Sequence, residues 1–227
     1  MLRYAQGRDQ ETAARPGAAH HRHHPGPRAR TGPGRRPRPA ARRAVRPDRA
    51  DESRTGYTRT AFKHWNAGAD STDGCNTRQE VLLAEAIETP TVGAGCSITG
   101  GKWLSYYDGQ TVTVASALDI DHMVPLAEAW DSGASAWTAA KREAYANDQD
   151  AATSLVAVTA RTNRSKADQD PAEWLPPASD QYCRYIGKWI ATKLRWDLTV
   201  DKAELDALKT FADGPREETV IDHQPAR

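Results

Sequence analysis

The sequence has little hydrophobic character. Only 38% of its 227 residues are hydrophobic, it contains two Phe, and its mean hydropathy is −0.75. No run approaches the ~18 consecutive apolar residues that a membrane-spanning helix requires. The sequence therefore predicts no such helix and no membrane partner. Its hydrophobic content still suits a folded domain, which we expect to be a monomer.

Large aliphatic residues are nearly absent from the first 50 residues, and Lys is absent altogether. This segment holds 13 Arg, seven Pro and five Gly against three acidic residues, a net charge of +10. Such a composition cannot bury enough apolar surface to offset chain entropy, so we expect residues 1–53 to be disordered. It is either an arm that binds nucleic acid or membrane by charge, or a functionless stretch of GC-rich DNA read from a wrong start or frame.

The rest of the chain is acidic and carries the aromatic residues. Residues 51–227 hold 18 basic and 27 acidic side chains, a net charge of −9, with all seven Trp and both Phe. We expect a folded domain over residues 54–212, starting near Gly56, and a polar tail over 213–227. Because the domain is acidic, binding to DNA would depend on local features rather than on net charge.

Cysteine is scarce, and no secretory signal peptide is recognisable. The pairs Arg35-Arg36 and Arg42-Arg43 are not followed by the ~7–15 apolar residues of an export signal. Cys75 and Cys96 are spaced for a local disulfide, which would stabilise the fold by ~3 kcal/mol. Cys183 is then left over, as a buried free thiol or with a lost partner. The cysteine pair favours an exported protein, and the missing signal favours a cytoplasmic one.

Sequence periodicity and propensity predict an α+β domain. A helix over 77–88 would begin with a capping box of Thr77 and Glu80. Residues 180–196 form the strongest amphipathic pattern. Further helices are expected over 136–147, 161–168 and 203–211, and strands over 111–117 and 155–159.

The most informative run is Asp-Ile-Asp-His-Met-Val-Pro at 119–125. In an extended strand Asp119 and Asp121 point to one face and His122 to the other, so a shared substrate would require a turn or bulge. Asp is a hard oxygen ligand suited to Mg²⁺, and His can accept a proton near neutral pH. Asn163 follows the expected strand 155–159 at the start of a helix, which predicts a compact one-metal site.

These two runs resemble the HNH (ββα-metal) endonucleases. The run at 119–125 and the run Asn-Arg-Ser-Lys at 163–166 are similar to those of the HNH domain of the RNA-guided CRISPR nuclease. A closer resemblance is to actinobacterial HNH proteins related to the C-terminal domain of a modification-dependent restriction enzyme. It covers roughly residues 56–211 and includes the runs at 74–78 and 170–177.

The resemblance implies a small domain built around a ββα-metal motif that hydrolyses DNA, with RNA as a second substrate class. His122 would be the general base, and Asp121 and Asn163 would hold one divalent metal, expected to be Mg²⁺ with Mn²⁺ as an alternative. Lys166 would stabilise charge near the phosphate, and Asp119 would support the site. Family members are usually secreted.

The sequence departs from the family pattern in two ways, and a stripe of basic residues predicts where nucleic acid would bind. The Asn that often precedes the second strand is missing, because residues 151–154 read Ala-Ala-Thr-Ser, and no export signal or C-terminal Cys is present. The rival hypothesis is a non-catalytic nucleic-acid-binding or interaction module on a degenerate scaffold. Nucleic acid would contact Arg164 and a stripe of Arg184, Lys188 and Arg195 on the helix over 180–196.

Overall fold

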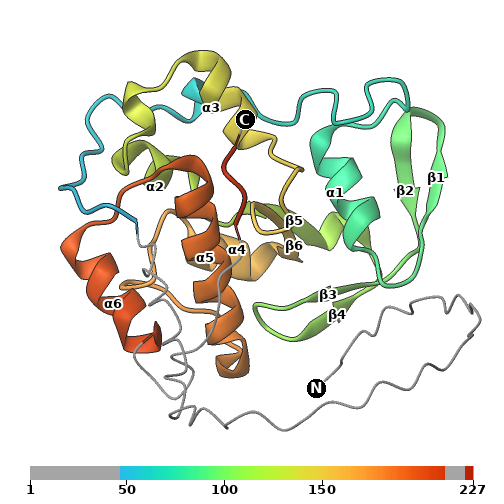
Figure 1. The fold of residues 1–227 in the computed structure, drawn as a ribbon. Coiled ribbons are helices and arrows are strands. Elements are labelled where there is room, and N and C mark those ends of the chain that lie inside the picture. The colour runs from blue at the N-terminus through green and yellow to red at the C-terminus, as the bar shows by residue number, and fades with distance from the viewer. Residues whose placement is uncertain (1–46, 213–222, 227) are drawn as a thin grey trace, which may run out of the picture. The chain divides into compact units, whose positions relative to one another are not determined.

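The computed structural model describes residues 47–212 and 223–226 (Figure 1). The expected disorder of residues 1–46 and the expected tail over 213–222 lie outside the described residues. Within them, helices combine with small antiparallel sheets, so the α+β class is confirmed. No described helix is both long and apolar enough to span a bilayer.

The helices and strands are short. The α-helices are α1 (Thr77–Glu85), α2 (Leu126–Asp131), α3 (Ala139–Ala146), α4 (Ala160–Lys166), α5 (Tyr182–Trp196) and α6 (Lys202–Ala212). The strands are β1 (Thr91–Gly93), β2 (Ser97–Thr99), β3 (Trp103–Ser105), β4 (Gln110–Val112), β5 (Leu118–His122) and β6 (Leu155–Thr159). Single 3₁₀ turns are η1 (Arg59–Ala61), η2 (Ala94–Cys96), η3 (Ala115–Ala117), η4 (Ala134–Ala136) and η5 (Ser179–Gln181).

The sheet of β5 and β6 lies between two hydrophobic cores. Its antiparallel register runs without a bulge from Leu118 opposite Thr159 to His122 opposite Leu155. On β6, Val156 and Val158 belong to the larger core, whereas Leu155 and Ala157 belong to the smaller one. Side chains alternate along a strand, so Asp119 and Asp121 lie on the larger-core face and His122 on the other.

The larger core gathers aromatic side chains from distant parts of the chain, including Phe62, Tyr107, Tyr145, Tyr185 and Trp189. The smaller core packs α1 against β3 and the sheet of β5 and β6, with Val81, Leu82 and Trp103 among its residues. Figure 1 shows α1 on one side of β5 and β6, and α4 and α5 on the other.

The folded domain extends beyond the expected boundaries. Arg49 forms a parallel bridge with Val200, and the amide of Val200 donates to the carbonyl oxygen of Asp48 at 2.8 Å. Part of the expected tail also packs, because the amide of Ala226 donates to the carbonyl oxygen of Arg195 at 2.9 Å. Residues before 54 and after 212 therefore belong to the described fold.

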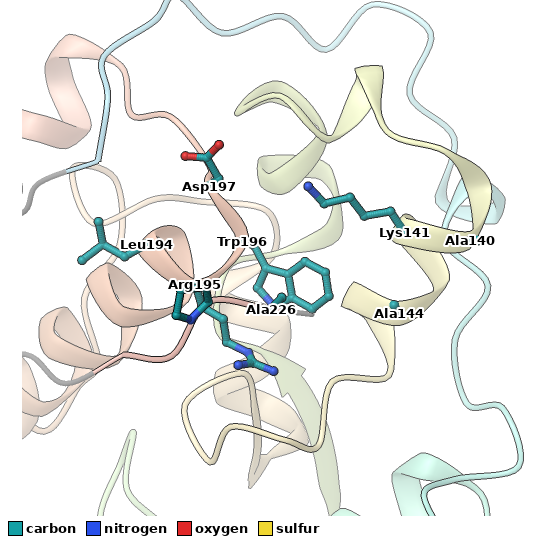
Figure 2. A pocket seen from close by; sticks show the side chains of 9 residues that line it. Ala140, Lys141, Ala144, Leu194, Arg195, Trp196, Asp197 and Ala226 are labelled. Atoms are coloured by element: carbon teal, nitrogen blue, oxygen red, sulfur yellow. The ribbon is translucent and has the colours of Figure 1, made fainter.

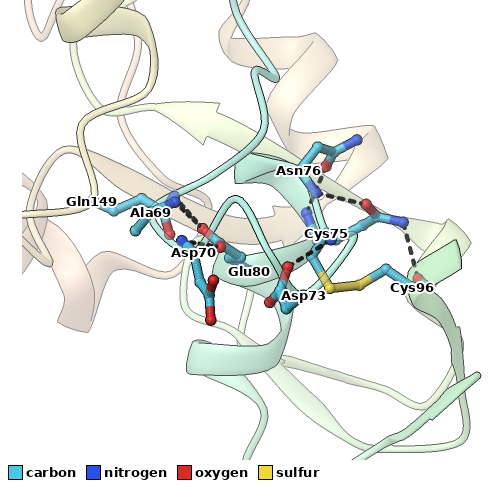
Figure 3. The surroundings of a disulfide bond; sticks show 9 residues. Ala69, Asp70, Asp73, Cys75, Asn76, Glu80, Cys96 and Gln149 are labelled. Atoms are coloured by element: carbon cyan, nitrogen blue, oxygen red, sulfur yellow. Dashed lines mark hydrogen bonds between the residues drawn. A yellow bond between two sulfur atoms is a disulfide. The ribbon is translucent and has the colours of Figure 1, made fainter.

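The start of α1 is braced by the expected disulfide, which is confirmed between Cys75 and Cys96 (Figure 3). The capping box uses Asn76 and Gln79, one residue before the expected pair of Thr77 and Glu80. Asn caps at least as well as Thr does, because its side-chain oxygen accepts from the amide three residues later, here that of Gln79. Among the described residues, Cys183 is the one free cysteine, and it is exposed rather than buried.

Several helix and strand boundaries differ from those predicted from the sequence. The helix α1 ends at Glu85, before the expected residue 88. The expected strand 111–117 is shortened to β4 and followed by η3. The Thr138 hydroxyl caps α3, which starts three residues after the expected position. The strand 155–159 is confirmed as β6. The sequence did not predict α2, β1, β2 or β3.

Candidate active site

His122 lies at the end of β5 with its ring almost fully buried. Its Nε2 is 2.9 Å from the carbonyl oxygen of Ala146 at the end of α3. A carbonyl oxygen only accepts, so Nε2 carries the proton of the neutral ring and Nδ1 has the free lone pair. None of the described residues hydrogen-bonds to Nδ1. The fold thus selects a tautomer that can accept a proton.

Burial is the main reason why the ring is uncharged. It lowers the pKa of His122 from 6.5 to about 3, although the hydrogen bond to Ala146 acts in the opposite direction. The positive charges of His64, Arg59 and Lys166 lower it further. His122 is therefore neutral near pH 7 and available as a base.

Two aromatic rings enclose the His122 imidazole. Trp65 stacks on it at a centroid distance of 5.4 Å and 28°, and Tyr145 lies at 6.4 Å and 20°. The ring of His64 stands nearly perpendicular to it at 6.2 Å. Sequence reasoning missed His64 and Trp65 because they precede the Asp-His run by more than 50 residues. Their one local signal is the run Phe-Lys-His-Trp at 62–65.

Asp121 and Lys166 form a buried ion pair on the other face of β5. The Lys166 ammonium donates to Asp121 Oδ2 at 2.6 Å and to the carbonyl oxygens of His122 and Met123 at 2.9 and 3.0 Å. The Tyr107 hydroxyl donates to the same Oδ2 at 2.5 Å. Burial raises the pKa of Asp121 and lowers that of Lys166.

This placement corrects the role expected of Lys166. Its side chain is fully buried, with all its hydrogen bonds directed at β5 and the residue after it, so it does not reach a phosphate at the surface. The helix α4 turns this position inward, toward Asp121. Lys166 therefore orients the Asp121 carboxylate instead.

Asp119 and Asn163 lie together closer to the surface. The Asn163 amide donates to Asp119 Oδ2 at 3.3 Å, and Nε of Arg164 lies 3.8 Å from the same oxygen. The Asp119 side chain is one-third exposed and that of Arg164 is 78% exposed. Asp119 thus contacts the predicted ligand Asn163, and its supporting role stays a prediction.

The oxygen atoms on this face fit a hard divalent cation. Oδ2 of Asp121 accepts hydrogen bonds from Lys166 and Tyr107, but no described residue donates to Oδ1 of Asp121. The Asn163 amide nitrogen faces Asp119, and no described residue donates to its side-chain oxygen. Mg²⁺ is typically held by one or two carboxylates together with substrate phosphate oxygens and water. Asp121, Asn163 and Asp119 offer oxygen ligands of this type.

His122 and these oxygens lie on opposite faces of the two-stranded sheet of β5 and β6. The register of β5 has no bulge, so the bend expected at Asp121 and His122 is absent from the strand. However, β5 pairs only with β6 among the described residues, and His122 is its last residue. Groups from both faces can therefore approach a ligand that lies across the end of β5.

Residues 73–211 match the family described as GmrSD restriction endonucleases, C-terminal domain. The chain belongs to this family. A protein of Arthroderma benhamiae, described as an uncharacterized secreted protein, is 43% identical over 156 residues, covering 69% of this chain and 74% of the relative. No solved structure matched the chain.

The basic stripe expected on α5 of this GmrSD C-terminal domain is not present as an exposed surface. Arg195 is buried, and its guanidinium donates to both oxygens of Asp148 at 2.7 and 2.8 Å. Lys188 donates to the carbonyl oxygen of Ala152, and burial lowers its pKa to about 8. Of the three, only Arg184 is exposed, 4.4 Å from the Tyr106 ring centre. Neighbouring chain segments cover the other two positions.

A second buried charge cluster in the GmrSD C-terminal domain lies away from β5. Oxygens of Glu52, Glu128 and Glu204 lie within 4.8 Å of one another. The buried Lys193 ammonium donates to Glu128 at 2.7 Å and to Glu204 at 3.0 Å. One ammonium balances one negative charge, and burial raises the pKa of Glu52 to about 8 and that of Glu204 to about 7, so bound protons reduce the remaining negative charge near neutral pH.

A cavity of about 700 Å³ is lined by residues other than His122. Figure 2 shows the side chains that line it. It is formed by α3, the C-terminal end of α5 and residues 225–226, with Lys141, Trp196 and Asp197 along its wall. None of the residues predicted for catalysis or metal binding lines it.

Proposed function

We propose that this GmrSD C-terminal domain is a metal-dependent endonuclease that hydrolyses phosphodiester bonds in DNA, with RNA as a second substrate class. The observation that carries the proposal is the fixed tautomer of His122 at the end of a strand whose other face presents Asp119 and Asp121, with Asn163 of α4 beside Asp119. The family description names restriction endonucleases, which act on DNA, and supports the same class of reaction.

In this mechanism His122 is the general base. Its Nε2–H stays on the carbonyl oxygen of Ala146, and Nδ1 takes a proton from the water that attacks phosphorus. Trp65 and Tyr145 hold the ring plane from two sides, which limits its rotation. The water oxygen forms a bond to phosphorus while the opposite phosphorus–oxygen bond breaks.

Asp121 and Asn163 would hold the divalent metal, for which Mg²⁺ is proposed. When bound, it would supply positive charge that stabilises the phosphate oxygens during hydrolysis. Lys166 and Tyr107 fix one oxygen of Asp121 and thereby orient the other. The carboxylate of Asp119 accepts from the amide nitrogen of Asn163, and this bond fixes the direction of the Asn163 amide oxygen.

The low pKa of His122 gives the substrate a further role. A general base is most effective when its pKa lies near the working pH, whereas burial lowers that of His122 to about 3. A phosphate anion close to the ring would favour the imidazolium and raise this pKa. Substrate binding would thus bring the base closer to its effective range.

We also propose that the protein acts outside the cell. The Cys75–Cys96 disulfide is of a kind that persists in oxidising compartments, and the relative from Arthroderma benhamiae is described as secreted.

Plasmid nicking tests the proposal directly. The full chain should nick supercoiled DNA in Mg²⁺ or Mn²⁺, and EDTA should abolish nicking. His122→Ala should lower the rate at least ~100-fold, as expected for loss of a general base. His223→Ala is a matched control, because it removes a histidine that has no part in the proposed site, and it should nick like the wild type. Nicking by His122→Ala at the wild-type rate would falsify the assignment of the base.

One observation favours the rival function of a non-catalytic nucleic-acid-binding module. The His122 side chain is only 6% exposed and lies beneath Trp65. This rival predicts that the chain binds DNA without cutting it in any of the metals. Metal-dependent nicking that requires His122 would exclude it.

A further inference from the structure

Two side chains of different kinds cover the His122 ring. Tyr145 belongs to α3 and to the larger core, is 3% exposed, and donates through its hydroxyl to the carbonyl oxygen of Val124. Trp65 lies in the irregular stretch between η1 and α1, partly buried at the margin of the smaller core. The core encloses Tyr145, whereas Trp65 stays partly open to solvent. Trp65 is therefore the cover that can move.

This cover leaves little of the ring open. His122 is 6% exposed, with the Trp65 ring stacked on it at a centroid distance of 5.4 Å and the His64 ring edge-on at 6.2 Å. A general base must come within about 3 Å of the group whose proton it takes, or reach it through one water. A phosphodiester of a nucleic-acid strand is much larger than water, so it needs a wider opening at the ring than this cover leaves.

The segment of residues 63–66 is held in place chiefly by one side chain. The Asn147 amide nitrogen donates to the carbonyl oxygen of Lys63 at 2.9 Å, and its amide oxygen accepts from the amide of Asn66 at 3.0 Å. Asn147 is itself anchored, because its nitrogen also donates to the carbonyl oxygen of Glu143 at 2.8 Å. The Lys63 ammonium adds an exposed ion pair with Glu143 at 2.9 Å. The end of α3 thus holds the segment closed.

The ends of this segment are fixed, but its middle is not paired with other backbone. Phe62 is fully buried at one end, and at the other the carbonyl oxygen of Asn66 accepts from the amide of Thr77 at 3.1 Å. No described residue accepts a hydrogen bond from the amides of His64 or Trp65. Opening of the segment is therefore a local event, because it breaks few contacts and leaves both ends in place.

The backbone at Trp65 favours such an opening. Its φ of +59° lies in the left-handed region, which bulky residues rarely adopt. Strain of this kind persists only where surrounding contacts enforce it, and it is concentrated at ligand clamps and switch segments. A return of Trp65 to ordinary backbone angles turns the peptide that joins it to Asn66, which breaks the bond from the Asn66 amide to Asn147. Release of that bond and movement of the Trp65 ring are thus one motion.

From these contacts we propose that residues 63–66 form a lid, latched by Asn147, that closes over His122 and opens to admit the phosphodiester. The assignment rests on the proposed nuclease function. When the lid opens, Trp65 leaves the ring, while Nε2 of His122 keeps its bond to the carbonyl oxygen of Ala146. The tautomer that a base requires is therefore retained, and the closed form is the inactive one.

Native-state hydrogen exchange of the full chain, without DNA or metal, measures the opening. The reporter is the Asn66 amide, which the latch protects. The reference is the amide of Met123, which directly follows His122, is fully buried, and donates to the carbonyl oxygen of Ser154 at 2.9 Å. The Asn66 amide should exchange at least ~100-fold faster than that of Met123, because local opening costs less free energy than global unfolding.

Chemical labelling of His122 measures whether the same opening exposes the ring. Diethyl pyrocarbonate acylates a neutral imidazole nitrogen, and mass spectrometry of the peptides gives the rate at His122. The wild-type rate should be far below that of free histidine. Asn147→Ala should raise it about 5- to 30-fold, as expected for two hydrogen bonds lost from the closed lid.

Lys141→Ala is the matched control, because it truncates an exposed residue of the same helix whose ammonium lies over the Trp137 ring instead. His122 in this variant should be labelled within about 2-fold of the wild-type rate. Thermal melting verifies that each variant is folded at the labelling temperature. If Asn147→Ala does not fold, the exchange of the Asn66 amide in the wild type decides by itself.

The outcomes separate the lid from the nuclease. Faster exchange at Asn66 than at Met123, with faster labelling in Asn147→Ala alone, supports the lid even if the chain never cuts DNA; in that case only the nuclease proposal fails. Equal protection of Asn66 and Met123, wild-type labelling as fast as that of free histidine, no gain in a folded Asn147→Ala, or an equal gain in Lys141→Ala would overturn the lid. Metal-dependent nicking would then leave the nuclease proposal standing.

Discussion

The Lys166 ammonium lies 2.6 Å from the Asp121 carboxylate, and both groups are withdrawn from solvent. The contact joins two residues that the sequence assigned to separate tasks, metal binding and phosphate contact. In the fold, Oδ2 of Asp121 accepts hydrogen bonds from Lys166 and Tyr107, and only Oδ1 remains for a ligand.

Removing Lys166 should destabilise the protein. Lys166→Met leaves the Asp121 carboxylate buried without its ionic partner, which should cost about 3–5 kcal/mol in the free energy of unfolding. Urea unfolding measures the change. The double variant Asp121→Asn with Lys166→Met should recover part of the loss. Arg164→Ala removes an exposed cation of the same helix and should change stability by less than about 0.5 kcal/mol. A loss below ~1 kcal/mol for Lys166→Met would contradict the buried pair.

His122 should make the fold sensitive to acid. Its pKa is about 3 in the folded state against the ordinary histidine value of 6.5, so the unfolded chain binds the extra proton between these values. The contribution of His122 to stability is therefore complete above pH 6.5 and is lost as the pH falls toward 3, by up to about 1.4 kcal/mol per pH unit. NMR titration should show no protonation of the His122 ring above pH ~4.5. A midpoint near 6.5 would disprove its burial.

The contribution of Glu52 to stability should change with pH in the opposite direction to that of His122. Burial and the neighbouring Glu128 raise its pKa from 4.5 to about 8, so the unfolded chain releases this proton at lower pH than the fold does. Its contribution to stability is lost as the pH rises from 4.5 to 8. Glu52→Gln should weaken that decline, by less than about 1.4 kcal/mol per pH unit because solvent screens the partly exposed group. Asp51→Asn, at an exposed neighbour, is the control for unfolding measured at pH 5, 6.5 and 8. An unchanged slope in Glu52→Gln would refute the coupling.

Loss of the disulfide should destabilise the start of α1. Replacing Cys75 and Cys96 by Ser opens a covalent loop with a sequence separation of 21 residues, which should cost about 3 kcal/mol. Cys183→Ser is the matched control, because this thiol is free and exposed. Chemical unfolding of both variants under non-reducing conditions gives the comparison. Equal stability of the two variants would show that the bond contributes nothing.

Much of the framework follows from local sequence. The apolar run at 155–159 forms β6, the amphipathic pattern forms α5, and the spacing of Cys75 and Cys96 allows the observed disulfide. These features depend on neighbouring residues, for which periodicity and spacing are direct physical signals. The tautomer of His122 could not be foreseen, because it depends on the carbonyl oxygen of Ala146, 24 residues away.

The helix faces show where sequence patterns stop being informative. Helical periodicity places Arg184, Lys188 and Arg195 near one another around α5, but it does not say what packs against them. Arg195 meets the buried Asp148, and Lys188 meets the carbonyl oxygen of Ala152, so both point inward. A basic residue that is buried and paired and one that is solvated can occupy the same position in the helical sequence pattern, so the pattern does not distinguish them.

By itself, the sequence determined the α+β class, the β6 strand, the disulfide pair and the Asp-His and Asn runs, because each is encoded within a short stretch. The tertiary structure alone decided that Lys166 supports Asp121 from inside and that His64 and Trp65 lie against His122. These relationships join residues 45 or more positions apart along the chain. Only packing of the whole core, which sets burial and therefore charge and tautomer, brings them together.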